Sequence, residues 1–393
     1  MTVIRRRQFW IAVHRYTGLA VLALLFVAGL TGCMLCFEKP LDRLLNPALF
    51  RPAAAGLADP LAAVAALERA RPALVASYFP VHAVPGRNIL VRVEPRPGRP
   101  APGYDEIFLD GGDGHVVAER ASVPGWDRAH LMRGIYLLHS TLLAGTVGRW
   151  LMGIAAAVWL ATSLVGAYIT LPLVPPYLRR WRRAWTMRPS RSPHRLLMDL
   201  HRTSGLWLLL PLAVLAFTSV AMNFFEELLI PVVQHVAPPR PSPFDGPPPR
   251  HPAPRGIALA DLVADAGRLA RERGLGWRPA IVQQEPDRGL LGVRFTRSGQ
   301  EEYRLLGPVT YWFDGRGRFV YEDSPYADSA GMKLQRSLYP LHTGEVIGGM
   351  GVALDVLLGA ATVLLSASGF YFWLRRRAVQ RHGRARAAAA GPA

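Results

Sequence analysis

Four stretches of this chain are apolar for long enough to cross a membrane as helices, each of which needs about 20 mostly apolar residues. Three of them carry no charged residue and the fourth has only Asp355 at its edge; they cover residues 18–37, 150–178, 203–225 and 356–374. Only 19% of the 393 residues are charged, against about a quarter in a soluble domain. The sequence therefore predicts a mainly α-helical membrane protein with four transmembrane helices, and it excludes a single soluble domain.

The positive charges predict how these helices are oriented. The formal net charge is +18, and the excess is concentrated in short segments. Four arginines precede the first apolar stretch, eight lie between the second and third beside one aspartate, and six follow the fourth. Because short cytoplasmic segments concentrate Lys and Arg, we expect both termini in the cytoplasm and both long segments outside it. The basic balance then reflects topology and requires no nucleic-acid partner.

The N-terminus has two further interpretations. Residues 6–9 resemble part of a twin-arginine signal, and residues 30–33 resemble a lipoprotein cleavage site. We favour an uncleaved first helix, because cleavage would discard His14, a residue that the rest of the chain mirrors.

The chain contains two copies of one unit. The motif His-Arg-x-x-Gly-Leu begins at His14 and again at His201, and a threonine follows each of these histidines by 17 residues. The motif Tyr-x-Leu-His, ending at His139 and at His342, introduces the second and fourth apolar stretches. Because each copy contains two helices, both have the same orientation, and a pseudo-twofold axis along the membrane normal relates them.

The two long segments repeat more loosely. Each begins with a helical pattern, at 61–71 and 259–273, and continues with strand-like runs and an Asp-Gly hairpin signal, at 107–111 and 311–315. We expect two small α+β domains, 38–133 and 231–338, the second opening with a proline-rich linker. The remaining parts are the N-terminus and first helix (1–37), the second helix with its preceding segment (134–178), a basic loop (179–200), the third helix (201–230), the fourth helix with its preceding segment (339–375) and a cytoplasmic tail (376–393).

The pseudo-twofold axis brings four histidines together as two pairs. His14 and His201 (the inner pair) meet near the cytoplasmic face, and His139 and His342 (the outer pair) meet near the opposite face. Two histidines facing each other in a helical bundle can ligate a b-type haem from both sides. A lone histidine at a helix end is more often an interfacial polar residue, but four at matched positions favour two haem b groups.

A single straight helix would carry the outer pair too far from the inner pair. Residues 136–168 would extend about 45 Å at 1.5 Å per residue, whereas the hydrocarbon core is about 30 Å thick. Glycines at 145 and 148 in one copy, and at 344, 348, 349 and 351 in the other, offer a break. We therefore expect a separate short segment to carry each outer histidine, with the spans starting near Arg149 and Val352.

Other polar residues are weaker candidates. Arg149 either binds a haem propionate or pairs with Asp355. His194 could share a helical face with His201, although we favour a solvated loop. Cys33 and Cys36 form a Cys-x-x-Cys that Phe37 follows, which excludes the usual c-type haem attachment; we favour buried small residues over a redox pair. The other histidines show no spacing typical of a structural zinc site.

These residues resemble the PepSY-associated transmembrane family of bacterial inner-membrane proteins. The matching motifs are His-Arg-x-x-Gly-Leu at 14 and 201, Leu-His at 138 and 341, Gly-Arg-Trp at 148, and Gly-Ala-Tyr at 166 with Gly-Phe-Tyr-Phe-Trp at 369. The resemblance spans about residues 7–377 and is weakest in the long segments. It implies periplasmic PepSY-like domains, two haem b groups held by His14, His201, His139 and His342, and reduction of ferric siderophores. The second copy has Val352 where the first has Arg149, so a propionate role belongs to the first copy alone.

The leading hypothesis is a dihaem b membrane oxidoreductase. Electrons would come from a cytoplasmic reductase or quinol and reach a periplasmic ferric complex, which the resemblance identifies as a ferric siderophore. A PepSY-type sensor without redox activity, an iron or siderophore transporter, and an electron carrier to a partner enzyme are the alternatives. An absorption spectrum of the purified protein separates the first of these alternatives from the leading hypothesis, because a sensor needs no haem.

Overall fold

The computed structural model describes residues 3–389, which divide into two compact units. The helical unit comprises residues up to 36, 135–230 and the chain from 341 onward. The sheet unit comprises residues 37–134 and 231–340. Each unit is therefore built from segments that lie far apart in the sequence.

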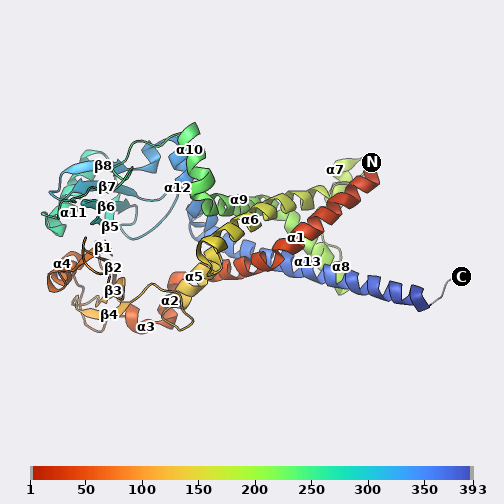
Figure 1. Cartoon of the computed structure of the whole chain (residues 1–393), viewed down its shortest axis with the longest axis horizontal. Coiled ribbons are helices and arrows are strands. Elements are labelled where there is room, and N and C mark those ends of the chain that lie inside the picture. The colour runs from red at the N-terminus through yellow and green to blue at the C-terminus, as the bar shows by residue number, and fades with distance from the viewer. Residues whose placement is uncertain (1–2, 390–393) are drawn as a thin grey trace. The chain divides into compact units, whose positions relative to one another are not determined.

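The helical unit contains three of the four predicted membrane helices as single helices. Three helices are long and apolar enough to cross a membrane: α1 (Val3–Leu35), α6 (Gly145–Tyr168) and α13 (Gly349–Ala389). Together with α9 (Leu209–Asn223), they run alongside one another (Figure 1). The second predicted stretch ends earlier than expected, because α6 stops at Tyr168 and a proline-containing segment follows.

The third predicted stretch is a bent pair of helices and not one straight helix. Helix α8 (Pro193–Trp207) and α9 meet at Leu208 with a bend of 68°, so a fourth span exists only if the two count as one. Pro211 explains the break, because a proline nitrogen cannot donate the helical hydrogen bond to the carbonyl of Trp207. This bend was not among the features predicted from the hydropathy of the sequence.

Short helices precede two of the spans, as the helix-length argument predicted. Helix α5 (Leu131–Thr141) is separated from α6 by residues 142–144, where Leu142 and Leu143 have positive φ angles of 52° and 58°. Helix α12 (Ala330–His342) is separated from α13 by a turn in which Gly344 and Gly348 have φ angles of 72° and 68°. These left-handed turns separate the short helix that carries each outer histidine from the span that follows it, which confirms the predicted break.

The sheet unit contains one antiparallel sheet of eight strands. The strands are β1 (Leu74–Pro80), β2 (Ile89–Pro95), β3 (Glu106–Leu109), β4 (Val116–Arg120), β5 (Arg278–Glu285), β6 (Leu290–Thr296), β7 (Val309–Asp314) and β8 (Phe319–Asp323), in the order β4-β3-β2-β1-β5-β6-β7-β8. Each half is preceded by a helix, α4 (Pro60–Ala70) or α11 (Leu259–Glu272), as predicted. Both Asp-Gly signals lie at hairpins, which is also as predicted.

The two predicted α+β domains share this sheet, which the sequence analysis did not foresee. Strand β1 pairs with β5, with Phe79 opposite Val282. Val64 of α4, Leu262 of α11 and the inward residues of both strand sets form one buried core, so both helices cover the same face (Figure 1). The domains are thus two halves of one folded body.

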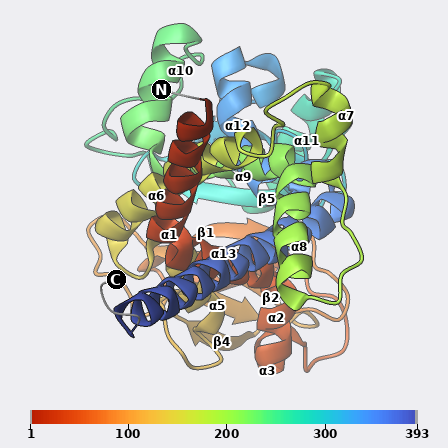
Figure 2. The ribbon, with the colours of Figure 1, turned by 90° about the vertical axis from the view of Figure 1, so that its right-hand side faces the viewer.

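The remaining short elements are α2 (Glu38–Leu45), α3 (Pro47–Phe50), α7 (Tyr177–Trp181), the π-helical turn η2 (Phe225–Leu229), α10 (Ile230–Val236) and the 3₁₀ turns η1 (Arg182–Trp185), η3 (Pro325–Ala327) and η4 (Glu345–Ile347). Figure 2 views the helical unit from the end at which α1 begins, where α7 and α8 also lie.

Candidate functional site

The outer pair of histidines meets in the helical unit. His139 near the end of α5 and His342 at the end of α12 have ring centres 6.3 Å apart, with ring planes inclined by 61°. Two imidazoles that share one metal ion through Nε2, at about 2.0–2.1 Å each, have ring centres roughly 6–7 Å apart. The separation of the outer pair therefore fits two axial ligands of one iron.

Hydrogen bonds fix which nitrogen of each outer histidine carries its proton. The Nδ1 of His139 lies 3.0 Å from the hydroxyl of Thr31, and that hydroxyl donates its own proton to the carbonyl of Val27 at 2.6 Å. Because a hydroxyl has one proton, Nδ1 of His139 is the donor in their contact. Nε2 is then unprotonated and keeps the lone pair that a metal requires.

The second copy repeats this arrangement. The Nδ1 of His342 lies 3.0 Å from the hydroxyl of Thr218, which donates to the carbonyl of Leu215 at 2.9 Å. Thr31 and Thr218 are both buried and are the two threonines that follow the inner histidines by 17 residues. The matched spacing is visible in the sequence, but a hydrogen bond between these threonines and the outer histidines was not predicted from it.

The inner histidines have the same protonation by different means. His14 on α1 donates from Nδ1 to the backbone carbonyl of Thr162 at 3.0 Å, and a carbonyl only accepts. His201 on α8 donates from Nδ1 to the hydroxyl of Ser368 at 2.6 Å, because this hydroxyl gives its proton to the carbonyl of Leu364. In this tautomer the Nε2 of each of the four predicted histidines keeps the lone pair through which an imidazole binds haem iron.

The inner rings do not contact each other as the outer rings do. Among the described residues, the ring of His201 packs against Phe372, with centres 5.8 Å apart, and makes no ring contact with His14. Space lies beside both, because a Cβ on Gly18 would meet nothing within 4 Å and one on Gly205 would meet only Leu365, at 3.8 Å. Each glycine follows its histidine by four residues and so shares its helix face. Apart from Leu365, no atom therefore lies within 4 Å of these two positions, as a flat macrocycle beside the histidines would require.

Two other glycines set the positions of the imidazoles themselves. A Cβ on Gly166 would lie 2.9 Å from Cε1 of His14, and one on Gly32 would lie 3.3 Å from Cε1 of His139. A side chain at either place would push the ring aside. The 6.3 Å separation of the outer pair, the hydrogen bonds at Nδ1 and the glycines beside the histidines are features that bis-histidine ligation of haem would require.

Arg149 is held in an ion pair with a residue that the sequence analysis did not consider. Its guanidinium contacts both carboxylate oxygens of Glu227, at 2.5 and 3.0 Å, and donates to the carbonyl of Asn223. The alternative pair of Arg149 with Asp355 is wrong: Asp355 accepts from the thiol of Cys36 at 3.4 Å. No sequence signal links Arg149 to a partner 78 residues away.

The structure corrects the expectation for His194 and shows the state of the two cysteines. His194 is not in a solvated loop, because it lies in the first turn of α8 with its ring against Tyr371 and Phe372, whose centres are 5.9 and 5.5 Å away. Cys33 and Cys36 are free, partly buried thiols, and Cys33 donates to the carbonyl of Val356 at 3.4 Å.

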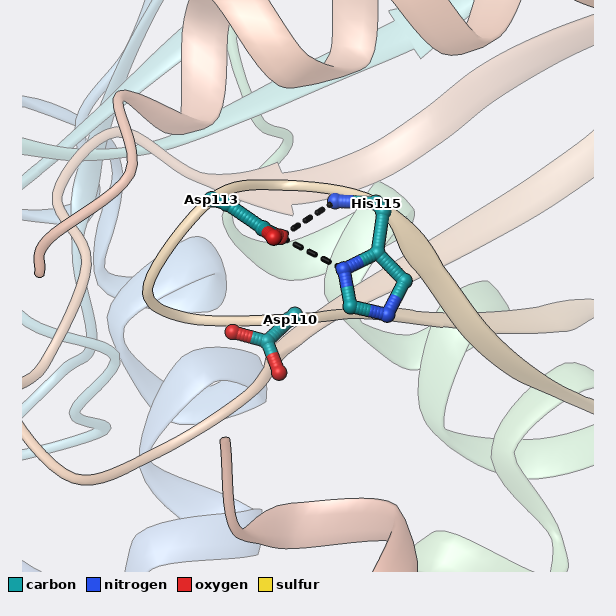
Figure 3. A group of neighbouring side chains, drawn as sticks. All are labelled: Asp110, Asp113 and His115. Carbon is teal, nitrogen blue, oxygen red and sulfur yellow. Dashed lines mark hydrogen bonds and ion pairs between the residues drawn. The ribbon is translucent and has the colours of Figure 1, made fainter. Parts of the chain in front are cut away.

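One cluster in the sheet unit has ligand groups near one another. Asp110, Asp113 and His115 offer atoms within 4.8 Å of each other at the β3–β4 hairpin (Figure 3). Asp110, however, accepts backbone N–H groups of Ala53 and Gly112 at 2.6 and 2.7 Å. Burial opposes ionisation of Asp110, but these donors outweigh it and lower its pKa. Its carboxylate is therefore committed to the turn.

The chain is similar to a known protein family and to a curated bacterial protein. A family model described as the PepSY-associated TM region matches residues 11–376, a range that includes all four histidines. An uncharacterized protein of Pseudomonas aeruginosa, PA4219, is 28% identical over 264 residues. That match covers 61% of this chain and 62% of the relative, so the chain spans about three-fifths of the length of the curated relative that it matches.

Proposed function

The chain belongs to the PepSY-associated transmembrane family, and on that premise we propose that it is a dihaem b oxidoreductase of the bacterial inner membrane. In this proposal the bent pair α8–α9 is the fourth span, both termini are cytoplasmic, and the sheet unit is a pair of periplasmic PepSY-like domains. The distribution of arginines supports this orientation.

One observation carries the proposal: four imidazoles, from matched places in two repeats, each have Nδ1 within 2.6–3.0 Å of a hydroxyl or carbonyl oxygen, which leaves Nε2 as the nitrogen for a metal. His14 and His201 would hold the inner haem, and His139 and His342 the outer one. Each haem supplies reversible one-electron chemistry at its iron. Arg149 could still meet a propionate, sharing its guanidinium with Glu227.

We assign the substrate by chemistry. The proposed donor is a cytoplasmic reductase or quinol, and the proposed acceptor is a ferric complex in the periplasm, such as a ferric siderophore. Reduction of ferric to ferrous iron weakens its binding to hard oxygen ligands. The reaction then needs no nucleophile and no general base in the protein.

The optical spectrum of the full-length protein tests this proposal. We expect a haem Soret band, two haems per chain, and reoxidation of the dithionite-reduced protein by a ferric siderophore. His139→Ala and His342→Ala should each leave one haem per chain. His82→Ala changes an exposed histidine of the sheet unit and should leave two.

The outcomes separate the alternatives. A purified protein without a Soret band would contradict the haem proposal and favour a sensor. A haem protein that no ferric complex reoxidises would instead favour an electron carrier to a partner enzyme, and siderophore flux in liposomes would favour a transporter.

A further inference from the structure

A folded, strongly basic surface follows α6 in the helical unit. Residues 169–198 contain no acidic residue, and their seven arginines are all exposed: Arg179, Arg180, Arg182, Arg183, Arg188, Arg191 and Arg195. No carboxylate of the described residues pairs with any of them, and the nearby Asp199 is engaged by Arg202 at 2.8 Å. We name residues 169–195 the basic platform. Its positive charge is uncompensated within this part of the chain.

Three tryptophans hold the platform in a fixed shape. Trp181 and Trp185 meet edge to face with ring centres 5.2 Å apart, and Trp185 meets Trp207 of α8 in the same way. The indole of Trp207 donates to the carbonyl of Trp185 at 2.9 Å, and the indole of Trp181 donates to the hydroxyl of Thr170 at 2.9 Å. The platform is therefore attached both to the end of α6 and to α8.

Two arginines add attachments of the platform to neighbouring helices. Arg202 of α8 donates to the carbonyl of Ala184 at 3.0 Å, and Arg7 of α1 donates to the carbonyl of Ile169 at 2.7 Å. Helices α1, α6 and α8 thus all fix its backbone. The arginine side chains project from a preformed surface, so less conformational entropy is lost when they bind a partner.

Exposed apolar side chains lie directly before the arginines. Leu173, Val174, Tyr177 and Leu178 are 46%, 49%, 58% and 81% exposed, and they follow the end of α6 within ten residues. Short helix α7 then brings Arg179 and Arg180 next to these apolar residues. An apolar strip beside guanidinium groups, with tryptophans at the end of a span, matches the boundary between acyl chains and headgroups.

We propose that the basic platform binds the phosphate headgroups of anionic phospholipids. Guanidinium groups form paired hydrogen bonds with phosphate oxygens, and the apolar strip contacts the adjacent acyl chains. A nucleic acid or an acidic protein would satisfy the arginines but leave the apolar strip exposed. The inference does not depend on haem binding or on electron transfer, so either can fail alone.

Lipid retention by the full-length protein tests the proposal. The protein is placed in nanodiscs of phosphatidylcholine with and without phosphatidylglycerol, extracted, and analysed for bound lipid by native mass spectrometry. We expect retained phosphatidylglycerol in clear excess over its share of the bilayer, and less of it at high salt. The variant R179Q/R180Q/R182Q/R183Q should weaken the preference by roughly tenfold or more.

A charge-matched control separates a site from net charge. The variant R51Q/R99Q/R250Q/R271Q removes four exposed arginines of the sheet unit and should keep the preference. If this fourfold platform variant does not fold, the double variant R179Q/R180Q, in which both substitutions lie in α7, should still lower the preference for phosphatidylglycerol. Equal losses in platform and control variants, unchanged lipid retention in the platform variants, or a wild-type protein that binds acidic protein or nucleic acid but shows no lipid preference would each overturn the proposal.

Discussion

The two repeats of the helical unit agree at one end and differ at the other. At the outer pair, Thr31 and Thr218 hold the imidazoles of His139 and His342 with the same geometry, each at 3.0 Å. At the inner pair, a backbone carbonyl holds His14, whereas the hydroxyl of Ser368 holds His201. Matched sequence positions therefore give matched hydrogen bonds only where the helices that carry them are also matched.

The shapes of the first and third spans explain this difference. Helix α1 is continuous through His14 and Thr31, whereas the bend at Leu208 separates His201 on α8 from Thr218 on α9. Because α9 carries the outer threonine and α8 the inner histidine, the bend reorients only the inner site. His201 then meets Ser368, which is one helical turn further along its span than the residue equivalent to Thr162.

The largest difference between the two copies is expected when one glycine of each copy is replaced and haem per chain is measured. Gly166→Leu places a side chain against His14 and should remove the inner haem, because even a Cβ would approach Cε1 to 2.9 Å. Gly369→Leu changes the corresponding residue of the second copy, where a Cβ would meet nothing within 4 Å, and should leave both haems. The pyridine haemochrome assay gives haem per chain for both variants; equal losses would contradict the structural difference between the copies.

The second-largest difference is expected between the two hairpin turns of the sheet unit, in the stability lost when the aspartate of each turn is replaced. Asp110→Ala leaves part-buried backbone N–H groups of Ala53 and Gly112 without their buried carboxylate acceptor, which should cost about 2 kcal/mol. Asp314→Ala removes contacts to the exposed segment of Arg316 and Arg318 and should cost less than half of that. Chemical denaturation followed by tryptophan fluorescence measures both, and a larger cost at Asp314 would contradict this ranking.

The same two aspartates predict an acid limit for the sheet unit. Burial raises the pKa of each, but hydrogen bonds from backbone N–H groups prevail, with Arg318 assisting at Asp314, so both pKa values lie below the ordinary value of 3.8. A carboxyl group whose pKa is lower in the folded protein than in the unfolded chain stabilises the fold at pH values above the unfolded pKa. This stabilisation is lost as the pH falls and protons bind the carboxylate. Stability should therefore decline as the pH falls below about 4. Asp110→Ala should flatten this decline when unfolding is measured across that range.

The outer threonines should give smaller and equal effects. Thr31→Val and Thr218→Val remove the acceptor for Nδ1 of His139 and of His342, which should cost about 1–2 kcal/mol each. A histidine that loses this acceptor becomes a less basic ligand, so the midpoint potential of one haem should rise by the same amount in both variants. Thr31→Ser and Thr218→Ser keep the hydroxyl and should restore the wild-type potential; unequal shifts would show that the outer sites are not equivalent.

Substitutions at the hydrogen-bond partners of the inner histidines should give the smallest change in haem potential. Only the partner of His201 should matter. Ser368→Ala removes the hydroxyl that accepts from His201, at a cost of about 1 kcal/mol. Thr162→Val removes a hydroxyl but keeps the carbonyl that accepts from His14, so the haem potential should barely change. Redox titration of both variants checks this. A larger shift in Thr162→Val would mean that the hydroxyl, 3.2 Å from Nδ1, is the true partner of His14.

The sequence predicted those parts of the fold and site that depend on local pattern and on the repeat. The short helices before α6 and α13 followed from comparing helix length with membrane thickness, and the four histidines followed from matched motifs. The hydrogen-bond partners of the inner histidines did not, because Thr162, which accepts through its backbone carbonyl, and Ser368, which accepts through its hydroxyl, lie at different offsets in the two copies. The bend at Leu208 had a signal in Pro211 that a hydropathy pattern does not register.

Contacts between residues far apart in the sequence were also not predicted. Glu227 and Arg149 come together only when α6 packs on α9 and the turn that follows it. The pairing of β1 with β5 joins strands whose individual patterns are complete without it, since either could equally have been an edge. Neither contact leaves a mark in the residues next to it.

The seam between β1 and β5 also constrains how the protein can be made. During synthesis β1 is made long before β5, and two apolar helices are made between them. The first four strands therefore form a sheet in which the edge of β1 stays unpaired until β5 is made. Such a flank is a template for the wrong neighbour, including the same strand of another nascent molecule. Strand β5 of the second repeat covers that flank, so we expect a chain that contains only the first repeat to aggregate.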